Sequence, residues 1–395
     1  MKAVKVLDNV WWVGAIDWNL RNFHGYATPT GSTYNAYLII DEKVALIDTV
    51  KAPFKDELLK RISSVIAPEK IDYVIANHAE MDHAGSLDAI KAAAPKAKFI
   101  AGKRGAEDIN RHFKSKFDFQ VVKTGDKIKI GKRSLEFIET PMVHWPDSMM
   151  TYCPEDAILY PNDMFGQHMA TAARFDDECK WDIVRREAAK YYANIFMPLA
   201  GPAAKAHAAV LKLNINIIAP SHGIIWRKSH KDIMAEYKKW IAGTAERKAV
   251  VVYDTMWNST EAMAKEIADG LLFEGVKVSY FGLQNNDPSE IMTDILEAKG
   301  VAIGSPTLNN LMLPSVSGFM NYLKGLKPAG KIGFAFGSHG WAGGGAAAVE
   351  EEMKECRIEI ISPCVTCKYI PDDDVLKKSY ESGVSLARII KKAFE

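Results

Sequence analysis

From residue 248 onward the sequence alternates strictly between short apolar runs and helical segments, and this alternation limits the possible fold more than any other feature. The expected strands are 248–253, 277–281, 300–304, 331–337 and 357–361, and the expected helices are 259–272, 288–298, 315–326, 346–356 and 372–392. Near-continuous apolar strands separated by helices are typical of a doubly wound parallel sheet whose two faces are both buried. We therefore predict one doubly wound α/β domain over residues 248–395.

The first part of the chain, residues 1–247, follows a different rhythm, with strands on both flanks of helical segments. Residues 34–40 and 44–50 are predicted to form a hairpin, 71–77 a buried strand, and 120–140 two or three further strands. Helical spacing appears at 182–196 and 205–213. Strands and helices in this order predict a sheet sandwich covered by helices. The charged stretch 244–248 separates the two parts.

The composition excludes several classes of protein. A hydrophobic content of 48% with 25% charged residues is typical of a globular chain, and a net charge of +1 gives no reason to expect nucleic acid as a partner. The apolar runs are strand-sized, and the N-terminus lacks the apolar region of a secretory signal, so we expect no membrane span and a cytoplasmic location. Five cysteines suit a reducing compartment. Cys364 and Cys367 have metal-site spacing but no second pair, so we interpret them as ordinary core or strand-end thiols.

Four potential metal ligands follow the buried strand 71–77 directly. They are His78, Glu80, Asp82 and His83. The carboxyl end of a buried strand is where an α/β protein places its site. Imidazole and carboxylate together suit iron, manganese or zinc.

Three later segments end apolar strands with further candidate ligands. They carry His144 in Pro141-Met-Val-His144-Trp-Pro-Asp147-Ser148, Asp163 in Pro161-Asn-Asp163, and His222 in Ser221-His222-Gly223. Each of these residues is a weak signal by itself. Their shared position at strand ends, after the first cluster, predicts one metal centre.

This set of seven ligands resembles the flavodiiron version of the metallo-β-lactamase fold, an αββα sandwich. The resemblance extends over essentially the whole chain and includes Phe23-His24-Gly25-Tyr26 and Thr33-Tyr34-Asn35-Ala36-Tyr37. In hydrolytic relatives the motif reads His-x-His-x-Asp-His and holds zinc, whereas this chain has Glu80 in place of the second histidine, which favours iron. The resemblance implies that His78, Glu80 and His144 bind one iron, that Asp82, His83 and His222 bind the other, and that Asp163 bridges the two. An iron with an open position for a gas could do without His83.

Other residues are expected around the metal centre. His24 and Tyr192, with Tyr26, are interpreted as proton or hydrogen-bond donors to a bound gas, with a packing role as the alternative. The histidines at positions 112, 168, 207 and 230 are expected at the surface.

Three loops at strand ends of the second domain form the expected flavin site. The first resembles the phosphate loop of flavodoxins and precedes a helix, whose N-terminal N–H groups suit a phosphate. Trp257, Asn258 and Ser259 depart from that loop's three inner positions, which leaves Thr255, Ser259 and Thr260 as hydroxyl donors. Trp341 is expected to stack on the isoalloxazine, with packing on its own domain as the alternative. The expected FMN contacts are Thr255, Met256, Trp257, Asn258, Ser259, Thr260, Ser305, Pro306, Thr307, Leu308, Asn309, Asn310, Ser338, His339, Gly340, Trp341, Ala342 and Gly343.

The two sites together predict an oxidoreductase that reduces O2 to water, NO to N2O, or both. Reduced FMN stores two electrons and a diferrous centre stores two more. Because no fused rubredoxin or reductase domain is recognised in the sequence, we expect a separate electron donor, rubredoxin or, as the alternative, a reduced deazaflavin. The resemblance implies a head-to-tail homodimer, alone or as a dimer of dimers. The alternatives are a dizinc hydrolase with a flavodoxin-like domain, and an electron carrier whose first domain is a structural relic.

Overall fold

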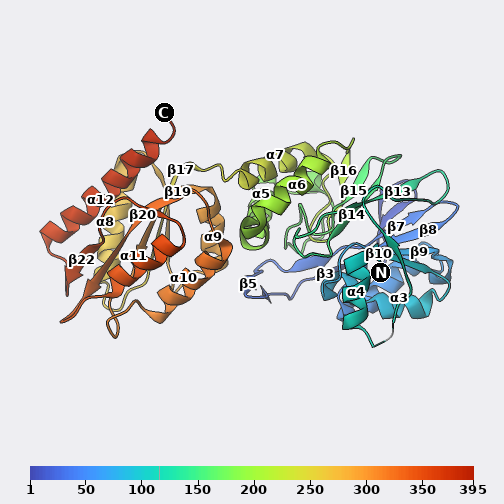
Figure 1. Ribbon diagram of the computed structural model, residues 1–395, viewed down its shortest axis with the longest axis horizontal. Coiled ribbons are helices and arrows are strands. Elements are labelled where there is room, and N and C mark those ends of the chain that lie inside the picture. Colours follow the sequence, from blue (N-terminus) through green and yellow to red (C-terminus); the bar gives the residue numbers. More distant parts are fainter. Residues whose placement is uncertain (115) are drawn as a thin grey trace. The chain divides into compact units, whose positions relative to one another are not determined.

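The computed structural model describes residues 1–114 and 116–395, which pack as two compact units (Figure 1). One unit comprises residues 1–192 and 199–238, and the other comprises residues 193–198 and 239–395. A junction between residues 247 and 248 would cut strand β17 (Glu246–Tyr253). We propose that the second domain starts near the end of helix α7 (His230–Ile241), because the Trp240 indole donates a hydrogen bond to Glu297 of that unit at 3.2 Å. Within the described residues, no helix is both long and apolar enough to span a membrane.

The first unit contains a seven-stranded sheet. Its strands, in spatial order, are β1 (Val4–Leu7), β2 (Val10–Trp12), β7 (Tyr37–Ile40), β8 (Val44–Ile47), β9 (Tyr73–Ala76), β10 (Lys98–Gly102) and β11 (Phe119–Val122). Strands β7 and β8 form the expected antiparallel hairpin, and β8 to β11 run parallel. Because parallel strands end at the same edge of a sheet, the residues that follow β8 and β9 lie close together.

A five-stranded sheet packs on the first one. Its strands are β12 (Lys127–Lys129), β13 (Ser134–Glu139), β14 (Met149–Cys153), β15 (Ile158–Tyr160) and β16 (Ile217–Ile218). One apolar cluster joins Ile75 and Ile100 of the first sheet to Phe137 and Ile158 of the second, so the core lies between the sheets.

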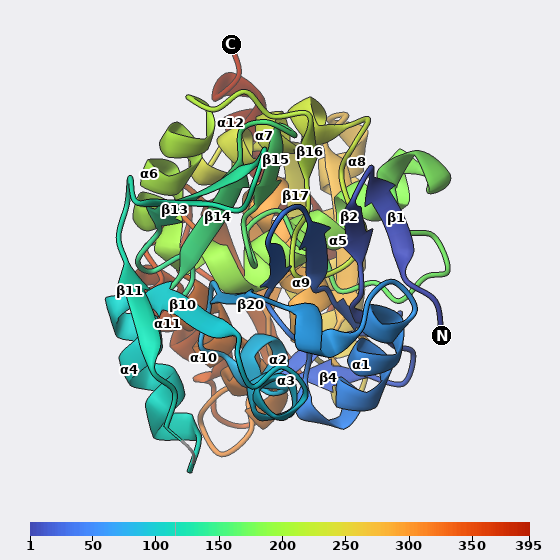
Figure 2. The ribbon, with the colours of Figure 1, turned by 90° about the vertical axis from the view of Figure 1, so that its right-hand side faces the viewer.

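Helices cover the outer faces of both sheets and complete an αββα sandwich. Leu58, Ile90 and Ile109 of the helices α1 (Lys55–Ser63), α3 (Leu87–Ala93) and α4 (Lys103–His112) pack on the first sheet. Figure 2 shows these helices below the first sheet, and α6 (Ala200–Val210) and α7 (His230–Ile241) above the second. Helix α5 (Trp181–Tyr191) continues into a π-helical segment, Tyr192–Phe196. The remaining elements of the unit are β3 (Ala15–Asp17), β4 (Asn22–Phe23), β5 (Tyr26–Ala27), β6 (Ser32–Tyr34) and α2 (Met81–Ala84).

The second unit is a parallel sheet with helices on both faces. Its strands, in spatial order, are β18 (Lys277–Gly282), β17, β19 (Ala298–Gly304), β20 (Ile332–His339) and β21 (Glu359–Ile360), and β22 (Val365–Lys368) also pairs with β20. Helices α8 (Ser259–Phe273) and α12 (Asp373–Lys392) share one apolar cluster with this sheet. The other helices are α9 (Pro288–Glu297), α10 (Pro314–Leu326) and α11 (Gly345–Glu355). The strand order reverses at β17, as in other doubly wound folds.

The predicted fold class of both parts is confirmed, and one element differs. The expected last strand, 357–361, is shortened to β21 (Glu359–Ile360), and the strand β22, which follows after an interruption at residues 361–364, was not predicted. Pro363 lies in the interruption, where its missing N–H breaks the hydrogen-bond ladder. Cys367 lies buried in β22, and all five cysteines are free.

Candidate metal centre and cofactor pocket

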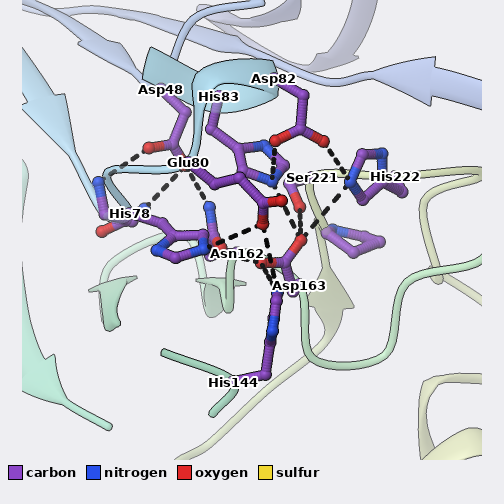
Figure 3. A network of polar contacts seen from close by, with 12 residues as sticks. Asp48, His78, Glu80, Asp82, His83, His144, Asn162, Asp163, Ser221 and His222 are labelled. Atoms are coloured by element: carbon purple, nitrogen blue, oxygen red, sulfur yellow. Dashed lines mark hydrogen bonds and ion pairs between the residues drawn. The ribbon is translucent and has the colours of Figure 1, made fainter. Parts of the chain in front are cut away.

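The seven predicted ligands meet at one edge of the sandwich, although they come from four separate segments of the chain (Figure 3). The segment after β9 carries His78 and Glu80 and then α2 with Asp82 and His83. His144 lies in the loop between β13 and β14, Asp163 follows β15, and His222 follows β16. All four segments therefore lie at the carboxyl ends of strands, which is where α/β proteins place their binding sites.

The ligands form two groups, and Asp163 faces both. In the first group, Glu80 Oε2 lies 3.4 Å from His78 Nε2 and 3.3 Å from His144 Nε2. Asp163 Oδ2 lies 3.7 and 3.6 Å from the same two nitrogens.

In the second group, Asp82 lies 3.3 Å from His83 Nε2 and 3.1 Å from His222 Nε2. The other Asp163 oxygen, Oδ1, lies 3.1 Å from the His83 nitrogen and 3.5 Å from that of His222. One carboxylate thus presents one oxygen to each group, which is the arrangement of a bridging ligand.

The bonding of this cluster fits bound cations. Within residues 1–114 and 116–395, six of its buried polar atoms make no hydrogen bond: Nε2 of His78, Nδ1 and Nε2 of His83, both carboxylate oxygens of Asp82, and Oδ2 of Asp163. Each such atom costs about 1–3 kcal/mol when it stays unsatisfied. Metal ions held between the two groups would satisfy all of these atoms except Nδ1 of His83, and a donor set of histidines and carboxylates suits iron.

The carboxylates give this site a negative potential. Burial acts to lower the pKa of His78, but the neighbouring Asp147, Glu80 and Asp163 raise it well above its usual range. Burial opposes protonation of His83 as well, yet Asp82 and Asp163 raise its pKa to about 9. The same potential favours a bound cation, and a cation competes with these protons for the histidine nitrogens.

Residues behind the ligands fix their orientation. Asp147 accepts a hydrogen bond from His78 Nδ1 at 3.0 Å and from the Ala79 N–H at 2.6 Å, so Nε2 of His78 faces the centre. The Thr33 carbonyl lies 2.6 Å from His222 Nδ1 and directs that ring in the same way.

A buried carboxylate that the sequence analysis missed joins two ligand segments. Asp48, directly after β8, accepts hydrogen bonds from the Asn77 N–H at 2.7 Å and from the Asn162 side chain at 3.3 Å. Because Asn77 precedes His78 and Asn162 precedes Asp163, this carboxylate ties both ligand-bearing strand ends together.

His24 lies beside the ligand cluster, and Tyr191, which was not named from the sequence, contacts the cluster as well. His24 Nε2 lies 3.2 Å from Glu80 Oε1, and 74% of its side chain is exposed, so it lies between the ligands and solvent. The Tyr191 hydroxyl donates a hydrogen bond to Asp163 Oδ1 at 3.0 Å. Tyr192, the tyrosine named from the sequence, is buried with its ring against Tyr237. Adjacent residues of a helix point about 100° apart, so Tyr191 and Tyr192 face different directions, and Tyr191 contacts Asp163.

The expectation that four histidines lie at the surface is wrong for two of them. His168 is buried, its ring centroid lies 4.7 Å from that of His222, and its Nδ1 lies 2.7 Å from Ser32 Oγ. His207 is buried against the Met234 carbonyl. His112 is exposed and His230 is half-buried. The signal for His168 was its position, since it follows Asp163 on the same strand-end loop.

In the second unit the three predicted loops line one cavity of about 910 Å³. The predicted residues that line it are Met256, Trp257, Ser259, Pro306, Thr307, Leu308, Asn309, Asn310, Ser338, His339, Gly340, Trp341 and Ala342. Tyr369 and Ile370, which follow β22, line it as well and were not predicted, because β22 itself was not expected.

The remaining predicted residues, Thr255, Asn258, Thr260, Ser305 and Gly343, are not among those that line the cavity. Thr260 Oγ1 lies 2.9 Å from Ser338 Oγ, and Ser305 Oγ accepts a hydrogen bond from the Leu313 N–H at 2.9 Å. Asn258 has a left-handed backbone and precedes α8. These contacts shape the loops from behind.

The cavity fits a flavin mononucleotide. Trp257 and Trp341 line the cavity and are 89% and 91% exposed. Their indole rings offer flat apolar surfaces suited to a planar ring. The N-terminus of α8 adjoins the first loop and suits a phosphate. Thr255 Oγ1 is buried and has no hydrogen-bond partner among the described residues.

An αββα sandwich with a two-group metal cluster, followed by a doubly wound domain with an aromatic-rimmed cavity, defines a class of two-domain metalloflavoproteins. The chain matches the family model described as "ODP family beta lactamase" over residues 33–223 and the flavodoxin model over residues 251–383. It is 47% identical to the nitric oxide reductase of Moorella thermoacetica over 98% of both chains. It is 40% identical to the rubredoxin-oxygen oxidoreductase of Megalodesulfovibrio gigas over 100% of this chain and 99% of that one.

Among solved structures, the flavodiiron protein of Giardia intestinalis superposes with a TM-score of 0.97 at 36% identity, covering 99% of this chain and 97% of that one. The chain belongs to the flavodiiron protein family. It is an oxidoreductase of the FMN and diiron type, so the resemblance stated from the sequence motifs is confirmed.

Proposed function

We propose that this chain reduces O2 to two waters, couples two NO molecules into N2O and water, or does both, at a diiron centre in its first domain. The observation that carries this proposal is the bridging position of Asp163, with Oδ2 toward one histidine group and Oδ1 toward the other. Two metal ions held by one carboxylate suit a reaction in which both take part.

The proposed ligands follow the two groups. His78, Glu80 and His144 would hold one iron, Asp82, His83 and His222 would hold the other, and Asp163 would be a ligand shared by both. Glu80 supports iron over zinc, because a carboxylate replaces the second imidazole of the hydrolase motif.

Bound iron supplies a redox-active Lewis acid for the gas, and bound FMN supplies the electrons. The chain contributes orientation and protons. Asp147 and the Thr33 carbonyl aim His78 and His222, and the Tyr191 hydroxyl holds Asp163 in place. His24 is the exposed donor next to Glu80, and we propose that it delivers protons from solvent.

The experiment that tests this function is anaerobic stopped-flow mixing of the reduced protein with O2 and, separately, with NO. Rapid flavin reoxidation with stoichiometric consumption of at least one gas is the expected result. Stoichiometric zinc in protein purified from its native source, with no gas consumed, would support the dizinc hydrolase instead.

We further propose that electrons cross between subunits of a head-to-tail homodimer, after arriving from a separate carrier such as rubredoxin or a reduced deazaflavin. Each domain binds its cofactor at the carboxyl ends of its own strands, so the two proposed cofactor sites belong to separate domains. The name of the Megalodesulfovibrio gigas relative supports rubredoxin as the donor. The free cysteines support a reducing, cytoplasmic location.

Subunit complementation tests the electron route. An iron-deficient variant, Asp163→Asn, is mixed with a flavin-deficient one, Thr260→Ala with Trp341→Ala, under conditions of subunit exchange. Heterodimers then regain one working pair and part of the lost activity. If heterodimers form without activity, while wild-type monomers stay active on dilution, electron transfer stays within one chain.

A further inference from the structure

A buried carboxylate lies at the start of the loop that is expected to hold the FMN phosphate. Asp254 follows β17 directly, and only 5% of it is exposed. Its Oδ1 accepts hydrogen bonds from the Thr255 N–H at 2.6 Å and from Gln284 Nε2 at 2.8 Å. Its Oδ2 accepts a short hydrogen bond from the Ser315 hydroxyl. Both carboxylate oxygens are therefore engaged.

The three donors come from three different connections of the domain. Thr255 begins the loop between β17 and α8, Gln284 follows β18, and Ser315 lies in the first turn of α10. Gln284 Nε2 also donates to the Thr255 carbonyl at 3.0 Å. Both backbone groups of Thr255 are therefore hydrogen-bonded: its N–H donates to Asp254, and its carbonyl accepts from Gln284.

Thr255 is the residue whose position matters for a phosphate. Its Oγ1 is buried and unpartnered among the described residues, and the loop that it begins leads to the N-terminus of α8. Hydroxyl groups and helix N–H groups bind a phosphate only when they point toward the same place. Hydrogen bonds that fix Thr255, the first residue of the loop, therefore also fix the positions of the donors that follow it.

A carboxylate close to a phosphate also repels it, and the two effects have opposite signs. No lysine or arginine is among the described residues that line the cavity. Three donors spread the charge of Asp254, and hydrogen bonds to charged groups are stronger than neutral ones. We therefore expect that losing the hydrogen bonds of Asp254 weakens phosphate binding more than removing its negative charge strengthens it.

We propose that Asp254 is a positioning residue that fixes the phosphate loop and so gives the domain its preference for FMN over riboflavin, which has the same ring and no phosphate. This inference rests on the proposed FMN site. It assigns Gln284 and Ser315 as the partners through which Asp254 acts.

The test is titration of the flavin-free protein with FMN and with riboflavin, followed by fluorescence quenching, for the wild type and four variants. Asp254→Asn replaces three hydrogen bonds to a charged carboxylate with hydrogen bonds to a neutral amide, which are weaker, and we expect it to weaken FMN binding about 10-fold or more. Riboflavin binding changes less than about 2-fold, because the ring contacts remain. Ser315→Ala keeps the carboxylate, removes one donor, and weakens FMN binding less. Combining it with Asp254→Asn adds no further loss.

Asp287→Asn is the matched control. Asp287 caps α9 by accepting hydrogen bonds from the Ser289 N–H and hydroxyl at 2.9 and 2.6 Å, and it is not among the residues that line the cavity. This variant keeps the wild-type affinity for both flavins. Equal or tighter FMN binding by Asp254→Asn overturns the proposal, as does an equal loss of both flavins. A wild-type protein that binds neither flavin refutes the FMN site itself.

Discussion

Replacing the proposed bridge, Asp163→Asn, removes one negative charge that faces both ligand groups. Unit charges 4 Å apart interact by about 4 kcal/mol at an effective dielectric constant of 20. Because 1.4 kcal/mol corresponds to a factor of ten, each iron should bind roughly 1000-fold more weakly. The amide also offers a single acceptor oxygen, so it cannot face His83 and His144 as the carboxylate does at 3.1 and 3.6 Å.

The assay measures iron per chain by mass spectrometry, flavin by absorbance, and O2 and NO consumption. We expect loss of iron and near-complete loss of gas reduction, with the flavin spectrum retained. Asp176→Asn is the control, because Asp176 is a buried carboxylate of the same domain that accepts hydrogen bonds from the N–H groups of residues 227–229. It should lose stability and keep its iron. An Asp163→Asn protein with two irons and full turnover would refute the bridging assignment.

Three further predictions follow from the same geometry. Protein from its native source should contain two irons and one FMN per chain by metal and flavin analysis. Iron binding to the metal-free protein should release protons, because the raised pKa of His83, about 9, keeps that residue protonated at neutral pH. The apparent affinity should rise with pH up to about 9, and calorimetry in buffers of different ionisation enthalpy at pH 7.5 should count at least about one proton released per metal pair. Tyr191→Phe should slow gas reduction about 10-fold or more through the lost hydrogen bond to Asp163, whereas Tyr192→Phe should leave turnover nearly unchanged; the reverse order would restore Tyr192 to the site.

The two folds and the convergence of the seven candidate ligands could be predicted from the sequence, because each rests on a local signal that the packing preserves. Strand–helix alternation produces a parallel sheet, and parallel strands end at one edge. His78, His144, Asp163 and His222 each follow an apolar run, so strand ends identified the cluster without any knowledge of the pairing. The strand β22 after the break was not predicted, and therefore Tyr369, which follows β22 and lines the cavity, was not predicted either.

The residues that were missed around the metal centre depend on packing rather than on local pattern. Whether Tyr191 or Tyr192 reaches Asp163 is decided by the rotation of α5 about its axis, which no spacing in the sequence specifies to within one residue. Asp48 follows β8 just as His78 follows β9, so the strand-end rule applies to it equally. Asp48 has no other candidate ligand beside it in the sequence, so nothing there indicated that it belongs to the site. Since Asp48 and Asp254 both follow a strand and brace the backbone of a binding loop, buried carboxylates at strand ends are candidates for positioning residues even where no motif surrounds them.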